Sequence, residues 1–177
     1  MTVRQAAFGL GANLGDPVTA LRGAVGFLRG CPELEVVAVS SLYRTAPVGG
    51  PAQPDYLNAV LVARTTAPPH RLLELAHAAE AAFNRTREVR WGPRTLDVDV
   101  LAVGEVSCDG QDLQLPHPRA HLRAFVLVPW AEVDPDFTVP GHGDVATLRE
   151  ALPTNDLQGV ERLPGGDTWW RAKAVAR

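Results

Sequence analysis

The sequence has little of what membrane-spanning, secreted or nucleic-acid-binding proteins need. Its two cysteines, Cys31 and Cys108, lack C-x-x-C spacing and are too few for a disulfide framework. We expect both to be structural thiols in a reducing cytoplasm. No stretch approaches the about 18 consecutive apolar residues of a membrane helix, and the first residues lack the apolar core of a secretion signal. The sequence therefore predicts a cytoplasmic protein that binds no membrane.

An excess of positive charge is also missing. The formal net charge is −3 at pH 7, whereas proteins that bind nucleic acids in general carry a basic surface. We therefore expect no nucleic-acid partner, and any phosphate site must be local. Lys173 is the only lysine among 17 basic residues, so a cluster of arginines is more informative than any single arginine.

The remaining composition fits one ordinary globular domain. The chain has 177 residues, of which 46% are hydrophobic and 21% are charged, which is enough apolar content for one core. We expect a single domain over residues 1–177 and a monomer.

Residues 90–101 carry the most informative pattern of the chain. Successive strand side chains point to opposite sides, so Asp97 and Asp99 share one face. The other face takes the apolar residues Leu96, Val98, Val100 and Ala102. Carboxylates two residues apart on a strand lie roughly 6.7 Å apart and repel each other unless a cation lies between them. Mg²⁺ is usually held by one or two carboxylates plus substrate phosphates, so both residues are candidate magnesium ligands.

An isolated pair of aspartates at this spacing is also typical of the solvated face of a half-buried strand. Two neighbouring features favour the metal site. The Gly92-Pro93 pair forces a turn just before the strand. Four arginines crowd the same short segment, at positions 85, 87, 90 and 94. The segment therefore predicts a site for a magnesium-bound polyphosphate.

The flanking segments alternate between strand and helix patterns. We expect strands over residues 5–10, 34–43 and 55–63, and a hairpin with turns at 104–105 and 109–110. We expect helices from Pro17, capped by Asp16, to Gly30, then over 69–83 and 126–133. On the second strand Leu34, Val36, Ala38 and Ser40 are predicted on one face, and Val37, Val39 and Ser41 on the other. The glycines at 9, 11 and 15 miss the G-x-G-x-x-G spacing by one residue, which disfavours a dinucleotide loop.

At residues 90–101 the run Arg-Trp-Gly-Pro-Arg-Thr-Leu-Asp-Val-Asp-Val-Leu resembles the signature of the 6-hydroxymethyl-7,8-dihydropterin pyrophosphokinase family of folate biosynthesis. The resemblance covers roughly residues 5–135, and residues 150–177 form a C-terminal extension. It implies ATP-dependent transfer of pyrophosphate to the pterin with release of AMP. It also implies two Mg²⁺ ions, ATP as co-substrate, and only small molecules as partners.

The resemblance assigns roles residue by residue. The catalytic set is Asp97, Asp99, Arg85 and Arg94, with the two aspartates as metal ligands. The pterin-binding set is Thr45, Val48, Gly49, Tyr56, Asn58, Trp91 and Phe125. The nucleotide-binding set is His77, Glu80, Arg87, Val100, His117 and Arg123. Three positions depart from frequent family residues, namely Ala12, Ala46 and Pro118, and the last places one nucleotide contact in doubt.

The order strand, helix, strand, strand, helix, strand predicts an α+β fold with a ferredoxin-like split βαβ antiparallel sheet. We expect the helices on one face of that sheet, with an added hairpin and C-terminal helices. Such a fold implies no chemistry by itself. A non-catalytic pterin- or nucleotide-binding module and an ordinary γ-phosphoryl kinase therefore remain as alternatives.

Overall fold

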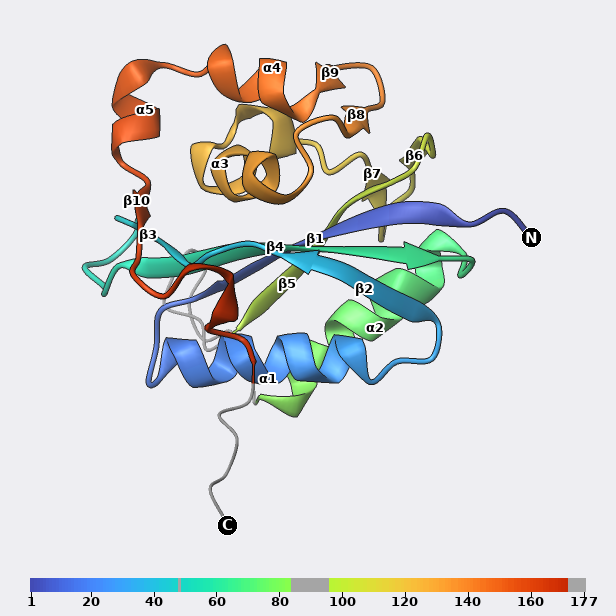
Figure 1. Ribbon diagram of the computed structural model, residues 1–177, viewed down its shortest axis with the longest axis horizontal. Coiled ribbons are helices and arrows are strands. Elements are labelled where there is room, and N and C mark those ends of the chain that lie inside the picture. Colours follow the sequence, from blue (N-terminus) through green and yellow to red (C-terminus); the bar gives the residue numbers. More distant parts are fainter. Residues whose placement is uncertain (48, 84–95, 172–177) are drawn as a thin grey trace.

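The computed structural model describes residues 1–47, 49–83 and 96–171 (Figure 1). Five predicted site residues lie outside this part of the chain: Val48, Arg85, Arg87, Trp91 and Arg94. In the described residues no helix is long and apolar enough to cross a membrane.

Residues 1–103 contain the predicted order of strands and helices, and shorter elements follow. The first part comprises β1 (Arg4–Ala12), α1 (Pro17–Arg29), β2 (Leu34–Val39), β3 (Tyr43–Thr45), β4 (Tyr56–Thr65), α2 (Pro69–Ala82) and β5 (Asp97–Val103). The second part comprises β6 (Cys108–Asp109), β7 (Gln114–Leu115), η1 (Ala120–Leu122), α3 (Ala124–Val133), β8 (Thr138–Val139), β9 (Gly143–Asp144), α4 (Val145–Glu150), α5 (Thr154–Gln158), β10 (Glu161–Arg162) and η2 (Gly166–Thr168). The predicted second strand is divided into β2 and β3, and the predicted hairpin is formed by β6 and β7.

The main sheet is antiparallel, with strand order β10-β3-β4-β1-β5, and β2 also pairs with β4. β4 lies at the centre because it pairs with β1 along its whole length and with β2 and β3 on its other edge. β5 pairs with β1, so Asp97 lies opposite Gly11 and Asp99 opposite Gly9. The two candidate metal ligands therefore sit next to glycines of the neighbouring strand.

Helices cover both faces of the sheet, the two helices of residues 1–103 on one face and helices of the C-terminal part on the other. α1 and α2 lie against one face, and α3 lies against the other with α4 packed on it (Figure 1). The reason is visible in β4, which is apolar on both sides. Leu57, Ala59 and Leu61 belong to the core cluster under α1 and α2, whereas Val60 and Val62 belong to the cluster under α3.

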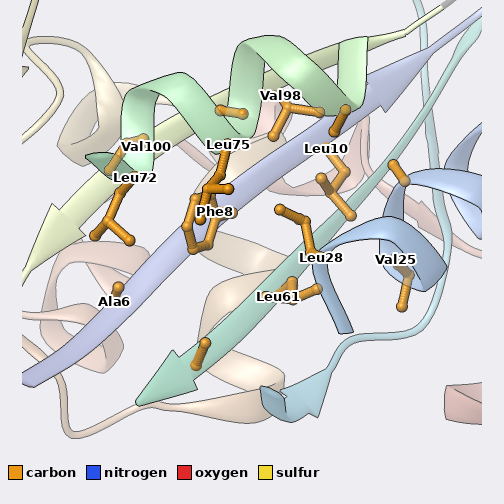
Figure 2. Close-up of a cluster of buried hydrophobic side chains, with 14 of the residues drawn as sticks. Ala6, Phe8, Leu10, Val25, Leu28, Leu61, Leu72, Leu75, Val98 and Val100 are labelled. Atoms are coloured by element: carbon orange, nitrogen blue, oxygen red, sulfur yellow. The ribbon is translucent and has the colours of Figure 1, made fainter. Parts of the chain in front are cut away.

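The larger core fills the space between the sheet and the first two helices. Figure 2 shows Phe8 of β1 surrounded by side chains of α1, α2, β4 and β5. Leu28 of α1 and Leu72 of α2 are fully buried in this cluster. α1 has the expected Asp16 cap, whose carboxylate accepts from the backbone N–H of Thr19 at 3.1 Å. Apolar burial of this kind contributes roughly 25 cal/mol per Å², so this core holds α1 and α2 on the sheet.

A β-bulge corrects the predicted faces of β2. Its register against β4 shifts between Val36 and Ala38. As a result Val39 joins Leu34 and Val36 in the larger core, while Ala38 packs on the opposite cluster. A bulge adds one residue to a strand and reverses the alternation beyond it, which a period of two cannot anticipate.

A second bulge changes the predicted faces of the C-terminal half of β5. The β1 partner of Val100 is Phe8 and that of Ala102 is Ala7, so Leu101 is the extra residue. Leu101 and Ala102 both lie in the cluster under α3, and Ala102 is therefore not on the face of Val98 as predicted. The bulge comes after Asp99, so both aspartates keep their predicted common face.

The C-terminal extension passes around the β3 edge of the sheet to α1. β10 pairs with β3, and Leu163 N–H donates to the carbonyl oxygen of Leu42 at 2.9 Å. The indole N–H of Trp169 donates to the carbonyl oxygen of Ser40 at 2.8 Å. Trp169 and Trp170 pack against the larger core.

Candidate functional site

The floor of the candidate site is a strip of sheet without side chains. Gly9 and Gly11 occupy the β1 positions that face α3, because the intervening Phe8 and Leu10 point into the larger core. Across the strands, Asn58, Gly11 and Asp97 form one row, and Gly9 lies next to Asp99. A Cβ on Gly11 would lie 3.1 Å from the Asn58 side-chain oxygen. Gly11 thus leaves room between the Asn58 amide and the Asp97 carboxylate, whereas the Leu101 side chain lies over Gly9, 3.3 Å from the position of a Cβ there.

Asp97 and Asp99 are both half-buried on this face. Mg²⁺ keeps several of its oxygen ligands from water and phosphate, so two protein carboxylates are a suitable donor set. No group of three or more histidine, cysteine, aspartate or glutamate side chains arranged to hold a metal occurs among residues 1–47, 49–83 and 96–171. The donors therefore fit a metal that arrives with a phosphate-bearing substrate.

Asn58 is held in a fixed orientation at one side of the strip. It is buried, and its Nδ2 donates to the hydroxyl oxygen of Thr45 at 2.8 Å. Because Nδ2 of Asn58 faces Thr45, its side-chain oxygen faces Gly11, which agrees with the 3.1 Å between that oxygen and the position of a Cβ on Gly11. Two of the predicted pterin contacts, Thr45 and Asn58, are thus paired with each other.

Gln53 connects the loop before β4 to the turn after β1. Its side-chain oxygen accepts from Asn13 Nδ2 at 3.0 Å and from the Tyr56 hydroxyl at 3.2 Å. Asn13 also donates to the carbonyl oxygen of Pro54 at 3.0 Å. These bonds fix Tyr56 next to the strip. The sequence singled out Tyr56 but not Gln53, because a lone glutamine in a proline-rich loop carries no pattern.

Phe125 and Arg123 approach the strip from the first turn of α3. Phe125 is half-buried and packs against the cluster of buried residues under α3. The Arg123 guanidinium carbon lies 5.5 Å from the centre of the Phe125 ring. Arg123 is the N-cap residue of α3. The strand pairing brings Tyr56, Asn58, Asp97 and Asp99 to one face of the sheet, and α3, which carries Phe125, covers that face.

A separate cavity of about 350 Å³ opens at the outer edge of β5. Four of the predicted nucleotide contacts line it together with Asp99: His77 and Glu80 from α2, Val100 from β5, and His117 from the loop before η1. The opposite wall consists of residues 111–114 between β6 and β7. The sequence missed that wall, since a short polar hairpin turn looks the same whether or not it lines a pocket.

Glu80 lines this cavity and also binds the backbone of β5. It is buried, and its Oε1 accepts from the backbone N–H of Val98 at 3.0 Å. Val98 lies between Asp97 and Asp99. Successive N–H groups of a strand point to opposite edges, and that of Val98 points to the edge of β5 that has no neighbouring strand in the described sheet. Glu80 thus fixes the strand that carries both aspartates, and its contact with a nucleotide stays a prediction.

His117 is held in its neutral form. Burial and the neighbouring Arg123 and Arg119 lower its pKa, although Asp97 acts in the opposite direction. Its backbone N–H donates to the carbonyl oxygen of Leu101 at 2.8 Å, and its Nδ1 accepts from the Arg119 N–H at 3.2 Å. The ring therefore keeps Nε2 as its available hydrogen-bonding atom in the cavity.

Gly49 and five residues outside the described ranges are the remaining predicted site residues. Gly49 is exposed in the loop after β3, with φ +69°. The predicted roles of Val48, Arg85, Arg87, Trp91 and Arg94 lie outside the described residues. The described part of the site has two compartments, the glycine strip and the cavity, and Asp99 lies next to both. Such a site suits an enzyme that joins two small molecules at a metal.

Comparison with known proteins agrees with this class. Residues 7–135 match the model of the 7,8-dihydro-6-hydroxymethylpterin-pyrophosphokinase (HPPK) family. The chain is 46% identical over 159 residues to a 2-amino-4-hydroxy-6-hydroxymethyldihydropteridine pyrophosphokinase of Methylorubrum extorquens, covering 90% of this chain and 98% of that one. It is 41% identical over 156 residues to the enzyme of the same name from Pseudomonas aeruginosa, covering 88% and 94%. The chain belongs to the HPPK family.

Solved structures show the same fold. Plasmodium falciparum HPPK-DHPS with pteroate has a TM-score of 0.67 at 11% identity, over 84% of this chain. The same protein with pterin and p-hydroxybenzoate has a TM-score of 0.63 at 13% identity, over 92% of this chain. The present chain spans 44% and 45% of those longer chains.

Proposed function

We propose that this chain transfers pyrophosphate from ATP to the hydroxymethyl group of 6-hydroxymethyl-7,8-dihydropterin, in folate biosynthesis. The chain is a pyrophosphokinase by family. The hydroxyl group gives up its proton as its oxygen forms a bond to the β-phosphorus, the bond from that phosphorus to the α-phosphate oxygen breaks, and AMP leaves. The observation that carries the proposal is the position of Asp99, which borders both the glycine strip and the cavity. A hydroxyl bound in the strip and a triphosphate extending from the cavity would meet there.

The pterin is proposed to lie on the glycine strip. Its flat ring would fit over Gly11, with Asn58 at its edge and Phe125 against its face. Tyr56, Thr45, Gly49, Val48 and Trp91 complete the proposed pterin site. Fixed polar partners at Asn58 favour a heterocycle with complementary donors and acceptors, since a ligand that left the buried amide unpaired would bind poorly.

The nucleotide is proposed to occupy the cavity at the β5 edge. Its adenine end would lie between α2 and residues 111–114, near His77, Glu80, Val100 and His117. The triphosphate would then extend toward Asp97, Asp99 and Arg123, with Arg85, Arg87 and Arg94 as further proposed phosphate contacts. A neutral His117 suits a hydrogen bond to sugar or base and adds no charge of its own.

Two Mg²⁺ ions are proposed as the metal complement, held by Asp97 and Asp99. Bound there, Mg²⁺ would neutralise phosphate charge and polarise the transferred group. The protein's own contribution is positional. Glu80 holds the Val98 N–H, and the β1 pairing holds Asp97 and Asp99 beside the strip, so the carboxylates are preorganised for charge that develops on transfer.

The proposal also covers the fold type, the number of domains, the oligomeric state and the location of the protein. We propose that β1, α1, β2 with β3, β4, α2 and β5 form a ferredoxin-like core, which the strand order β5-β1-β4-β3 supports. We also propose a single domain, a monomer and a cytoplasmic location.

The decisive experiment follows ATP labelled at the β-phosphate, incubated with Mg²⁺ and the hydroxymethyl-pterin. Pyrophosphoryl transfer moves the label to the pterin and releases unlabelled AMP. An ordinary kinase leaves the label in ADP, and a non-catalytic binding module leaves ATP intact. Labelled ADP without AMP would overturn the proposed transfer even if each binding residue were confirmed.

A further inference from the structure

A hydrogen-bond cluster joins α3 to the start of β3. Its centre is the Glu132 carboxylate, whose Oε1 accepts from the Ser41 hydroxyl at 2.6 Å and whose Oε2 accepts from the Tyr43 hydroxyl at 2.7 Å. The Ser41 backbone N–H donates to both oxygens, at 3.2 and 3.0 Å. The Glu132 side chain is only 22% exposed, so competition from water is limited. Charge-assisted bonds of this length are among the stronger ones in proteins.

The C-terminal extension closes the cluster. Arg162 of β10 donates through Nε to the Ser41 hydroxyl oxygen at 3.1 Å and through its terminal nitrogen to Glu132 at 3.4 Å. The backbone of Arg162 pairs with Tyr43. Burial and the hydrogen bond to Glu132 raise the pKa of Tyr43, so its hydroxyl keeps the proton that it donates. Three segments that are distant in sequence are thus fixed to one carboxylate.

These segments carry the pterin side of the proposed site at their other ends. α3 contains Phe125 in its first turn, seven residues before Glu132, which is about 10 Å along a helix. β3 ends at Thr45, which accepts the hydrogen bond from Asn58. Pro129 lies between Phe125 and Glu132 and removes the backbone hydrogen bond to the Phe125 carbonyl. The restraint from Glu132 therefore reaches Phe125 through the fully buried Leu127 and Trp130 as well as along the helix.

We propose that Glu132 is a positioning residue for the pterin compartment, acting through Ser41 and Tyr43 to set the spacing between Phe125 on α3 and the Thr45–Asn58 pair on the sheet. The inference rests on the proposed function and assigns Glu132 no contact with either substrate. It predicts that loss of the cluster widens the pterin compartment and leaves the cavity at the β5 edge unchanged, since neither Glu132 nor Tyr43 lines that cavity.

The test uses Tyr43→Phe, which removes one hydroxyl and keeps the ring, and Glu132→Gln, which weakens every bond of the cluster. The matched control is Glu161→Gln, next to Arg162 on the same strand. Glu161 makes an exposed ion pair with Arg44 at 3.5 Å and no bond to Glu132. The dissociation constants of the hydroxymethyl-pterin and of Mg²⁺ with a non-hydrolysable ATP analogue are measured separately, well below the melting temperature of each variant.

We expect Glu132→Gln to raise the pterin dissociation constant about fivefold to tenfold and Tyr43→Phe about threefold, as for loss of partly buried hydrogen bonds. Nucleotide affinity and the control should change less than about twofold, within the usual effect of a surface charge. The double variant should bind pterin no more weakly than Glu132→Gln, because both changes break the same cluster.

Equal losses for both ligands, or unchanged pterin affinity with a lower melting temperature, would overturn the positioning role and leave Glu132 as a stabilising residue only. If Glu132→Gln does not fold, Tyr43→Phe gives the same two outcomes with its ring volume retained. A wild-type chain that binds no pterin would instead overturn the proposed function, so the two failures are distinguishable.

Discussion

The two faces of the sheet differ most clearly along β1. Toward α1 and α2 this strand presents Phe8 and Leu10, which are buried in the larger core (Figure 2). Toward α3 the alternate positions of the same strand are Gly9 and Gly11. One strand therefore combines a filled face with a face that has no side chains over part of its length. The difference teaches that β1 is packed along its α1 and α2 face, whereas its α3 face, which has a smaller core that includes Leu101, leaves space near Gly11.

The polar residues follow the same division. Asn58, Asp97 and Asp99 all surround the glycine strip, and their neighbours in sequence point into the larger core. Substitutions on the two faces should consequently have separable effects, on catalysis in one case and on unfolding in the other.

The largest effect is expected for Asp97→Asn and Asp99→Asn. Each change removes a carboxylate charge at a half-buried position and no core volume. We expect kcat to fall on the order of 1000-fold, as for loss of a preorganised electrostatic group, with little change in melting temperature. Steady-state kinetics over a range of Mg²⁺ concentrations measure this, and the exposed Asp167→Asn is the control. Near wild-type rates at saturating Mg²⁺ would contradict the metal assignment.

The opposite pattern is expected on the filled face. Leu28→Ala removes a fully buried side chain from the larger core and should reduce the free energy of unfolding by about 2 to 5 kcal/mol. Below the melting temperature kcat/KM should stay within about twofold of wild type, since surface and core sites distant from the ligands act independently. Chemical denaturation and kinetics on the same preparation measure both quantities. A large loss of kcat/KM in the folded variant would show that the two faces are not separable.

The sequence predicted the orientation of the two aspartates better than it predicted the packing around them. The alternation at Asp97 and Asp99 is a local pattern, and the structure has it. Beyond Val36 and beyond Val100 the alternation fails, because bulges depend on how two distant strands pair. The placement of α3 opposite α1 was missed for a related reason, since β4 is apolar on both sides and its pattern does not say which helix covers which side.

The supporting contacts were the least predictable part. Glu132 is linked to Ser41 across 91 positions of sequence and Gln53 is linked to Asn13 across 40. Glu80 was singled out for its family position, yet its bond to the Val98 N–H follows only from the edge location of β5. Long-range polar pairs carry no periodicity, so a single sequence gives no signal for them.

A smaller and selective effect is expected for Phe125→Ala. The ring is half-buried beside the strip, and aromatic contacts contribute roughly 0.5 to 1.5 kcal/mol beyond the area that they bury. We expect pterin affinity to fall about tenfold while the affinity for Mg²⁺-bound ATP changes little. Calorimetry with each ligand separately tests this, with the exposed Leu122→Ala as the control. Equal losses for both ligands would make Phe125 a core residue only.

Filling the strip itself should have a moderate effect. Gly11→Ala places a methyl group 3.1 Å from the Asn58 side-chain oxygen, so that side chain must shift. We expect pterin affinity to fall about fivefold, in line with modest overpacking. Gly26→Ala on α1 meets no atom within 4 Å and is the matched control. It should keep pterin affinity and stabilise the helix by about 0.5 to 1 kcal/mol. Similar pterin affinities for both variants would argue against a ligand above Gly11.

The smallest effect is expected at a histidine pair on the α3 side, away from the strip. The rings of His121 and His142 stack with centroids 3.7 Å apart. Burial, and then the neighbouring His142, lower the pKa of His121 below its ordinary value of 6.5. The folded chain therefore binds fewer protons than the unfolded chain in this range, and stability falls as the pH is lowered through about 6.5.

The pKa of His117 is lowered as well, so the pH dependence of the wild-type stability contains both groups. His142→Asn removes one cause of the shift at His121 alone, and the fall in melting temperature between pH 8 and pH 5.5 should become slightly smaller without vanishing. The exposed His70→Asn on α2 is the control and should run parallel to wild type. Parallel curves for His142→Asn and wild type would show that the stacked pair does not affect the pH dependence of folding.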